Sequence, residues 1–201
     1  MTAPDARPHP RPRPRLLVVV GALVAVLAAA LVGLVSPASA ATPFCGITWG
    51  SLPQNGAAVH PGGTLTNVRA GEQACFDRLV IDIAGTTAFD AWHVQYVTHV
   101  FNDPKSDLVP LRGGAFLQIT VQSPDHTPAG ALTYRPANRT ELVNVGGYRT
   151  FRQVAWAGES EGYSSIGLGV RARLPMRAFA LSGIPGNPNG TRVVIDVAHS
   201  W

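Results

Sequence analysis

The sequence predicts an all-β fold, specifically a β-sandwich of short, mostly antiparallel strands. Two observations support this prediction. Segments rich in Val, Ile, Thr and Tyr alternate apolar with polar residues, and clusters of Gly, Asn, Asp and Pro separate them. After residue 40, no stretch keeps an apolar period of 3.6 residues, so we expect no long helix there. Residues 41–201 are enough for a single domain with a sizeable core.

The clearest predicted strand is Ala115–Gln122, in which Leu117, Ile119 and Val121 alternate with polar residues and would point inward. We expect seven further strands, at Gly46–Ser51, Phe76–Ala84, His93–Phe101, Phe151–Ala157, Ser164–Arg171, Arg177–Leu181 and Arg192–Ala198.

Turns are predicted where glycine, asparagine and proline cluster between these strands, at Gly85-Thr86, Asn102–Pro104, Gly113-Gly114, Gly146-Gly147 and Gly186–Gly190. The longest irregular stretch is Ser123–Tyr148. Within it we expect a short helical turn around Glu141–Val145.

Residues 1–40 have the features of an export signal. A basic, proline-rich start with four arginines precedes Leu16–Val35, in which every residue is Leu, Val, Ala or Gly. Ser36–Ala40 then provides the small residues that signal peptidase accepts. The apolar run is long, so an uncleaved helix that anchors the domain in the membrane through residues 16–35 is the alternative.

Without residues 1–40, the domain has 12 Lys and Arg against 11 Asp and Glu, because four of the 16 basic residues and one of the 12 acidic residues lie in the signal. A net charge of about +1 gives no reason to expect a nucleic-acid partner. The two cysteines of the chain, Cys45 and Cys75, both follow the signal. In an oxidising compartment we expect them to form a disulfide.

One seven-residue pattern occurs twice. Arg78–Ala84 reads RLVIDIA and Arg192–Ala198 reads RVVIDVA, with five identical positions. In both copies, Arg and Asp share the face opposite the apolar residues, where they can meet each other or cross-strand partners. The repeat predicts a sandwich with approximate two-fold internal symmetry.

Four segments together resemble the AMIN-like domain of exported actinobacterial proteins: Cys45–Ser51, Phe76–Asp82, His93–Val97 and Val193–His199. The resemblance covers nearly all of residues 45–199. Related AMIN domains are small β-sandwiches that occur beside cell-wall amidases and on secretin subunits. The resemblance therefore implies a non-enzymatic module of the cell envelope, whose partner would be a cell-wall polymer such as peptidoglycan or an envelope protein.

A secreted hydrolase is one alternative, because Gly158–Gly162 matches G-x-S-x-G around Ser160, and Asp196 and His199 follow in the order of an α/β-hydrolase. A nucleophile elbow needs a helix after the serine, whereas an alternating strand follows here. We therefore predict a hairpin turn and no catalytic residues. A carrier of an apolar ligand is the other alternative.

We also expect no cofactor and no metal. His93 and His99 share a strand face, but six strand residues span about 20 Å, too far for one ion. His126 and His199 have no companion at ligand spacing.

A polymer-binding surface would combine guanidinium groups with aromatic faces. Such residues are frequent in the C-terminal half, and we expect Trp49 and Trp92 to belong to the core instead. The candidate binding residues are Arg149, Arg152, Arg171, Arg173, Tyr148 and Tyr163.

We predict that export removes residues 1–40 by cleavage after Ala40. Mass spectrometry of the extracellular protein should then give a chain that starts at Ala41. A chain that starts earlier would contradict cleavage and support the anchor.

Overall fold

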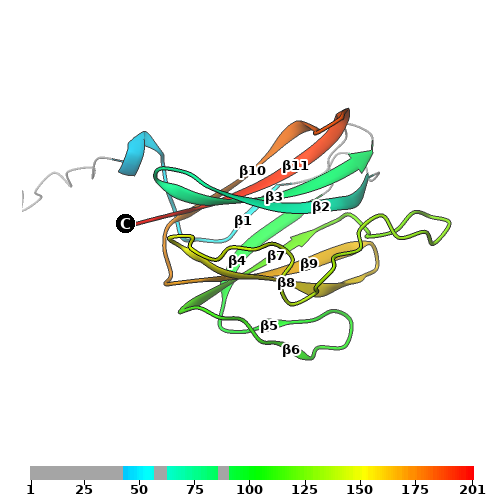
Figure 1. Cartoon of the computed structure of the whole chain (residues 1–201), viewed down its shortest axis with the longest axis horizontal. Coiled ribbons are helices and arrows are strands. Elements are labelled where there is room, and N and C mark those ends of the chain that lie inside the picture. Colours follow the sequence, from blue (N-terminus) through cyan, green and yellow to red (C-terminus); the bar gives the residue numbers. More distant parts are fainter. Residues whose placement is uncertain (1–42, 57–62, 86–90) are drawn as a thin grey trace, which may run out of the picture. The chain divides into compact units, whose positions relative to one another are not determined.

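In the computed structural model, two antiparallel sheets face each other across one hydrophobic core (Figure 1). The structure describes residues 43–56, 63–85 and 91–201. The chain divides into Met1–Ala41 and Thr42–Trp201, and all described residues belong to the second unit. The predicted signal or anchor therefore lies outside the described residues. Within the described ranges, no helix has the length and apolar character needed to cross a bilayer.

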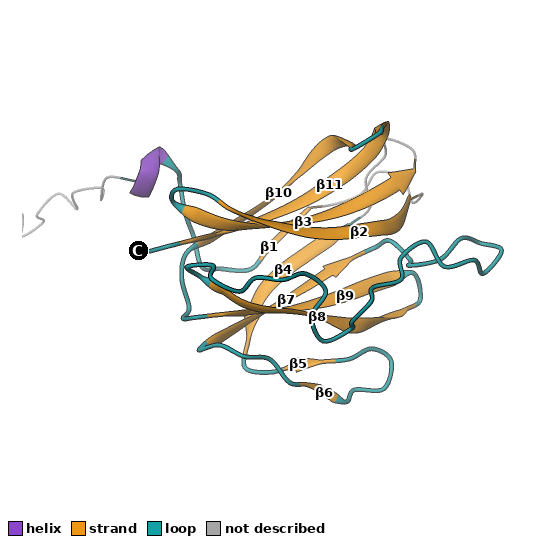
Figure 2. Ribbon diagram, in the orientation of Figure 1, coloured by secondary structure: helices purple, strands orange, loops and turns teal. Residues whose placement is uncertain are grey.

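Strands account for nearly all the regular structure (Figure 2). In spatial order, the five-stranded sheet contains β1 (Gln54–Gly56), β4 (Trp92–Val97), β7 (Ala115–Val121), β9 (Tyr163–Val170) and β8 (Phe151–Ser160). The four-stranded sheet contains β10 (Met176–Ile184), β11 (Asn187–Ala198), β3 (Phe76–Gly85) and β2 (Gly63–Glu72). The all-β prediction is confirmed.

A small third layer lies on the side of the five-stranded sheet away from the core (Figure 1). It contains β5 (Val100–Phe101) and β6 (Leu108–Val109), which pair with each other. The segment that follows β6 lies close against β9, because a Cβ on Gly169 would lie 2.0 Å from the carbonyl oxygen of Arg112. No larger residue fits that position without moving the backbone.

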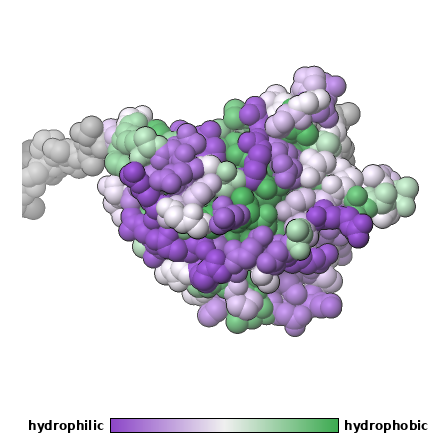
Figure 3. All heavy atoms as spheres, viewed as in Figure 1, coloured by the Kyte–Doolittle hydropathy of each residue, from purple (hydrophilic) through white to green (hydrophobic). Residues whose placement is uncertain are grey.

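The core follows from the alternation of the strands. Leu117 and Ile119 of β7 are fully buried, as are Leu79 and Ile81 of β3 and Ile195 of β11. Burial of large aliphatic side chains from both sheets is the main stabilising contribution, about 1.5–3 kcal/mol for each. In the view of Figure 3, hydrophobic residues show in the middle of the molecule between hydrophilic surfaces, and smaller hydrophobic areas lie elsewhere on this face.

The sequence repeat is explained by strand pairing. β3 and β11 are neighbours in the middle of the four-stranded sheet, with Val80 opposite Val194 and Arg78 opposite Asp196. The hairpins β2–β3 and β10–β11 therefore lie on either side of a local two-fold axis. The approximate symmetry relates two hairpins of one sheet rather than the two sheets.

Several predicted boundaries are wrong for identifiable reasons. Gly46–Ser51 is not a strand, because a short 3-10 turn occupies Phe44–Gly46 and only Gly50 makes an isolated bridge. The predicted strand His93–Phe101 is interrupted after Val97. The predicted turn Gly186–Gly190 is too long, since Ile184 already pairs with Asn187 at the start of β11.

β2 was not predicted because its alternation changes phase. A bulge between Leu65 and Asn67 places one extra residue in the strand. Leu65 and Val68, which are three positions apart, therefore both point into the core. A search for strict alternation misses this strand.

The predicted helical turn at Glu141–Val145 is also wrong. The backbone there bonds to the edge of β8 instead of to itself, as Leu142 donates to Val154 and Trp156 donates to Arg139. This loop covers an edge strand that would otherwise be open to other chains.

The predicted disulfide is present and joins Cys45 to Cys75, 30 residues apart. It fastens the first described turn to the β2–β3 connection. A loop of this length corresponds to about 3–4 kcal/mol in the chain-entropy description of disulfide stabilisation.

A buried carboxylate links the two sheets. Asp77 of β3 is fully buried and accepts hydrogen bonds from the backbone N–H groups of Thr150 (2.6 Å) and Phe151 (2.9 Å), which lead into β8. Its other oxygen lies 3.0 Å from Nε2 of His199. Three donors from two segments thus compensate one buried charge.

We predict that Asp77→Ala lowers the free energy of unfolding by about 3–5 kcal/mol, because it leaves buried donors from both segments without their acceptor. Urea unfolding measures this loss. The matched control is Asp107→Ala, since Asp107 is exposed. Equal stability of the two variants would contradict the role of Asp77.

A second prediction concerns alkaline pH. Burial beside Trp156 raises the pKa of Tyr134 from 10.0 to about 12. The unfolded state therefore loses this proton first as pH rises, and stability falls between pH 10 and 12. A difference of two pKa units between the folded and unfolded states corresponds to about 2–3 kcal/mol of the free energy of unfolding. Over this range the free energy of unfolding should fall by this amount more in the wild type than in Tyr134→Phe, and parallel curves would contradict the shift.

Candidate functional site

The outer face of the four-stranded sheet carries two carboxylates covered by arginines. Asp196 of β11 is fully buried although it points away from the core. Arg78 of β3 donates Nε and Nη2 to its two oxygens at 2.6 and 2.9 Å, and Arg177 of β10 donates Nε at 2.8 Å. The hydrogen bond to Asp196 raises the pKa of Arg78 above its usual value.

The second carboxylate has a similar arrangement. Asp82 of β3 accepts two hydrogen bonds from Arg69 of β2, at 2.8 and 3.0 Å. Arg192, opposite Asp82 in the pairing of β3 with β11, instead donates to the carbonyl oxygen of Ser182. These four arginines and two aspartates leave two uncompensated positive charges on the outer face.

Aromatic rings surround two of these arginines. The guanidinium carbon of Arg177 lies 5.5 Å from the ring centre of Trp49, 5.4 Å from that of Phe76 and 5.2 Å from that of Phe179. Arg78 lies 5.1 Å from Phe76. We call this group the arginine–aromatic cluster. Its members are Trp49, Phe76, Arg78, Arg177, Phe179 and Asp196.

The cluster is partly open. The side chains of Arg78 and Arg177 remain 29% and 31% exposed while Asp196 holds them. In the part of the chain that the structure describes, the terminal amino groups of Arg177 have no hydrogen-bond partner. The cluster therefore offers a positioned cation with free N–H donors next to aromatic faces, which suits a carboxylate or phosphate attached to an apolar or sugar surface.

The residues predicted from sequence fall into three groups. Tyr148, Arg149 and Arg152 lie together before and at the start of β8, where Arg152 donates to the carbonyl oxygen of Tyr148 and Arg149 pairs with Glu72 at 3.2 Å. Tyr148 and Arg152 line a hollow of about 360 Å³.

Arg171 and Arg173 lie in the connection between β9 and β10 and are exposed. Arg171 donates to the carbonyl oxygen of His199, and Arg173 lies 4.7 Å from the ring of Tyr96. Tyr163 lies at the β8–β9 turn, near the opposite end of β8 from Arg152.

The cluster itself was missed because Trp49 was expected in the core. Trp49 is half-buried and packs on Phe76 with ring centres 5.9 Å apart, whereas Trp92 is in the core as predicted. Part of the cluster can nevertheless be recognised from residue spacing in the sequence. Phe76 and Arg78 are two apart, as are Arg177 and Phe179, so alternation places each pair on one face.

The hydrolase alternative does not agree with the geometry. Ser160 ends β8 and pairs with Tyr163 across a two-residue turn, with β9 following directly. His199 contacts Asp77, which is bonded to Phe151 at the other end of the ten-residue β8, about 30 Å away. Asp196 points to the outer face and is bonded to arginines. These residues form no triad.

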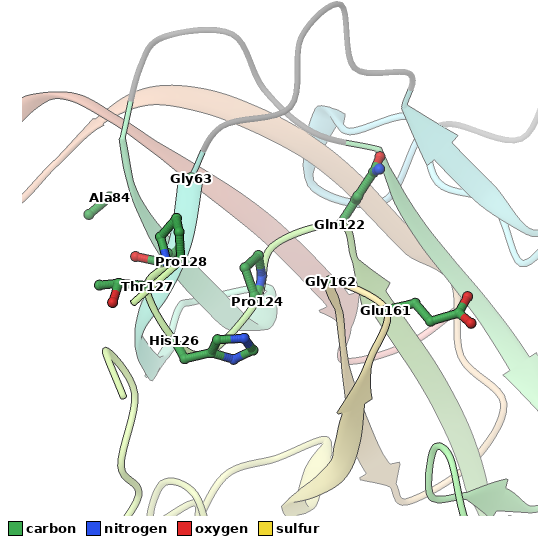
Figure 4. A pocket seen from close by; sticks show the side chains of 10 residues that line it. Gly63, Ala84, Gln122, Pro124, His126, Thr127, Pro128, Glu161 and Gly162 are labelled. Atoms are coloured by element: carbon green, nitrogen blue, oxygen red, sulfur yellow. The ribbon is translucent and has the colours of Figure 1, made fainter. Parts of the chain in front are cut away.

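The apolar-carrier alternative would need a hollow within the core. A hollow of about 500 Å³ lies at one end of the sandwich, between loops (Figure 4). Figure 4 shows the ring of His126 beside Pro124, whereas Glu161 points away from that ring. None of the described lining residues belongs to the hydrophobic core.

Two groups of potential metal ligands occur among the described residues. The first contains Glu72, Asp77 and His199, of which Asp77 and His199 form the link between the sheets. The second contains Asp125, His126 and Glu159. Sequence spacing could not predict either group, because its members come from segments far apart in the chain. His93 and His99, which we did not expect to share an ion, belong to neither group.

Comparison with known proteins gives one family. The AMIN-like domain matches residues 63–199. No curated protein and no solved structure matches the chain. The match spans more than half of the 201 residues, including both copies of the repeat and most of the outer face described above. The chain belongs to the AMIN-like domain family.

Proposed function

We propose that this protein is a non-enzymatic, exported module that binds peptidoglycan or an envelope protein through the arginine–aromatic cluster. The observation that carries the proposal is the arrangement of Arg177, which is surrounded by three aromatic rings and held by a buried carboxylate. Its terminal amino groups have no hydrogen-bond partner among the described residues. The AMIN-like family in general points to a non-enzymatic module of the cell envelope.

The chemistry of wall polymers matches this surface. Peptide stems carry carboxylates, which arginine can bind through paired N–H donors, and sugar rings present apolar faces that pack on aromatic side chains. Two uncompensated positive charges on the outer face favour an anionic partner and increase the rate of encounter. The net charge of the whole domain is small, so attraction would be local.

Preorganisation supports the same proposal. A free arginine loses side-chain freedom when it binds a ligand, at a cost of about 0.5–1.5 kcal/mol. Asp196 already restricts Arg78 and Arg177 in the unbound protein. The aromatic rings restrict Arg177 further, so binding would require little additional ordering.

The disulfide supports both export and the site. A disulfide between Cys45 and Cys75 is stable in an oxidising compartment outside the cytoplasm. It also fastens the segment that contains Trp49, whose indole N–H donates to the carbonyl oxygen of Phe44 at 2.9 Å. Reduction would therefore loosen one side of the cluster.

We predict that Arg177→Ala and Trp49→Ala each reduce retention on purified peptidoglycan sacculi at least tenfold, because each removes a central part of the cluster. Co-sedimentation at a series of protein concentrations measures this effect. Arg78 still pairs with both oxygens of Asp196 in these variants, so the domain should fold, and thermal unfolding checks that it does.

The matched control is Arg173→Ala. Arg173 is also an exposed arginine next to an aromatic ring, that of Tyr96, but it lies outside the cluster. Its removal should leave retention unchanged. Loss of retention in Arg173→Ala together with full retention in Arg177→Ala would reject the cluster and favour the connection that contains Arg171 and Arg173.

A further inference from the structure

The second group of potential ligands contains Asp125, His126 and Glu159. Its two carboxylates have fewer hydrogen bonds than the buried carboxylates described above. Asp77, Asp82 and Asp196 each receive a hydrogen bond on both oxygens. Asp125 and Glu159 do not. In the described part of the chain, Oδ2 of Asp125 and Oε2 of Glu159 accept no hydrogen bond, although these side chains are only 12% and 18% exposed.

We propose that Asp125, His126 and Glu159 bind a divalent metal cation such as Zn²⁺. The proposal is independent of the arginine–aromatic cluster and of the partner that the cluster binds. It rests on the convergence of one imidazole nitrogen and two incompletely bonded carboxylates, a donor set that suits Zn²⁺.

The fold brings the three side chains together from distant segments. Asp125 and His126 follow β7, and a backbone bridge between His126 and Leu132 closes their loop. Glu159 lies near the end of β8, directly after a register shift. At this shift Gly158 has a φ of 101°, and a Cβ there would lie 2.1 Å from the carbonyl oxygen of Asp103.

Both carboxylates approach the same nitrogen. Nδ1 of His126 lies 3.0 Å from Oδ1 of Asp125 and 3.9 Å from Oε2 of Glu159. A single N–H can donate at the shorter distance, whereas 3.9 Å is too long for a hydrogen bond. One proton therefore cannot satisfy both carboxylates. A cation between the three atoms would compensate both charges.

The separations fit such a cation. Zn²⁺ lies about 2.0–2.2 Å from nitrogen and oxygen ligands, so tetrahedral coordination places two ligand atoms about 3.4 Å apart. The two observed distances, 3.0 and 3.9 Å, bracket this value. All three ligand atoms lie within 4.8 Å of one another. Backbone N–H of Gly162 holds the other oxygen of Glu159 at 2.9 Å, which fixes the direction of that carboxylate.

The surroundings leave room for a fourth ligand. Asp125 and Glu159 also line a hollow of about 410 Å³, together with Asp103 and Asn102. Water or an oxygen of a bound molecule could complete the coordination from this side. Lys105 and Arg139 line the same hollow, and among the described residues neither forms an ion pair with the three ligands.

The other group, Glu72, Asp77 and His199, does not offer the same site. Two backbone N–H groups and His199 already satisfy Asp77, and Glu72 pairs with Arg149. A cation there would have to displace the link between the sheets. Of the two groups, we therefore propose the one formed by Asp125, His126 and Glu159 as the metal site.

Isothermal titration of the untagged, metal-free protein with ZnCl₂ near pH 7.5 tests the proposal. We expect one equivalent to bind, with at least tenfold weaker binding in Glu159→Gln and in His126→Ala. The control His99→Ala changes an exposed histidine elsewhere and should bind as the wild type does. Thermal unfolding with and without Zn²⁺ is a second readout, because a cation that binds only the folded state raises the melting temperature.

The absence of a one-to-one site in the wild type would overturn the proposal. So would equal affinity in Glu159→Gln and the wild type, since the ion would then be held by other residues. If His126→Ala fails to fold, Glu159→Gln remains decisive, because it preserves the size of the side chain.

Discussion

The pairing of β3 with β11 is the constraint on which the rest of the structure depends. It joins strands from the two ends of the domain in one register, with Val80 opposite Val194. That register places the apolar residues of both strands in the core and brings Arg78 to Asp196 on the other face. If the pairing shifted by one residue, the side chains that now point into the core would point outward, and the arginines and aspartates would point inward. The same pairing thus determines the core, the local symmetry and the position of the arginines.

Carboxylates perform different tasks in this domain according to the donors around them. Asp77 joins two sheets because backbone N–H groups and a histidine surround it. Asp196 positions arginines next to aromatic rings because guanidinium groups surround it. Asp125 and Glu159 have few donors and are suited to a cation. Carboxylates in a single small domain therefore differ in role: one stabilises the fold, and the others support the two binding proposals made above.

The sequence was sufficient to predict the strands with strict alternation, such as β7 and β3, and also the disulfide. It was insufficient where alternation fails, as at the bulge of β2, and where the backbone bonds to a distant strand, as in the loop on the edge of β8. The site was harder to predict for a similar reason. Trp49, Phe76 and Phe179 come together only through the sheet and the disulfide, so their proximity depends on tertiary structure.

The separation between the paired strands affects how the chain folds. Arg78 and Asp196 are 118 residues apart, so their contact closes almost the whole domain. Contacts of such high sequence separation form slowly, because a long loop must close before any of them contributes stability. During synthesis, the hairpin β2–β3 emerges long before its partner β10–β11. The four-stranded sheet therefore stays incomplete, with an open strand edge on β3, until the hairpin β10–β11 is available to pair with it.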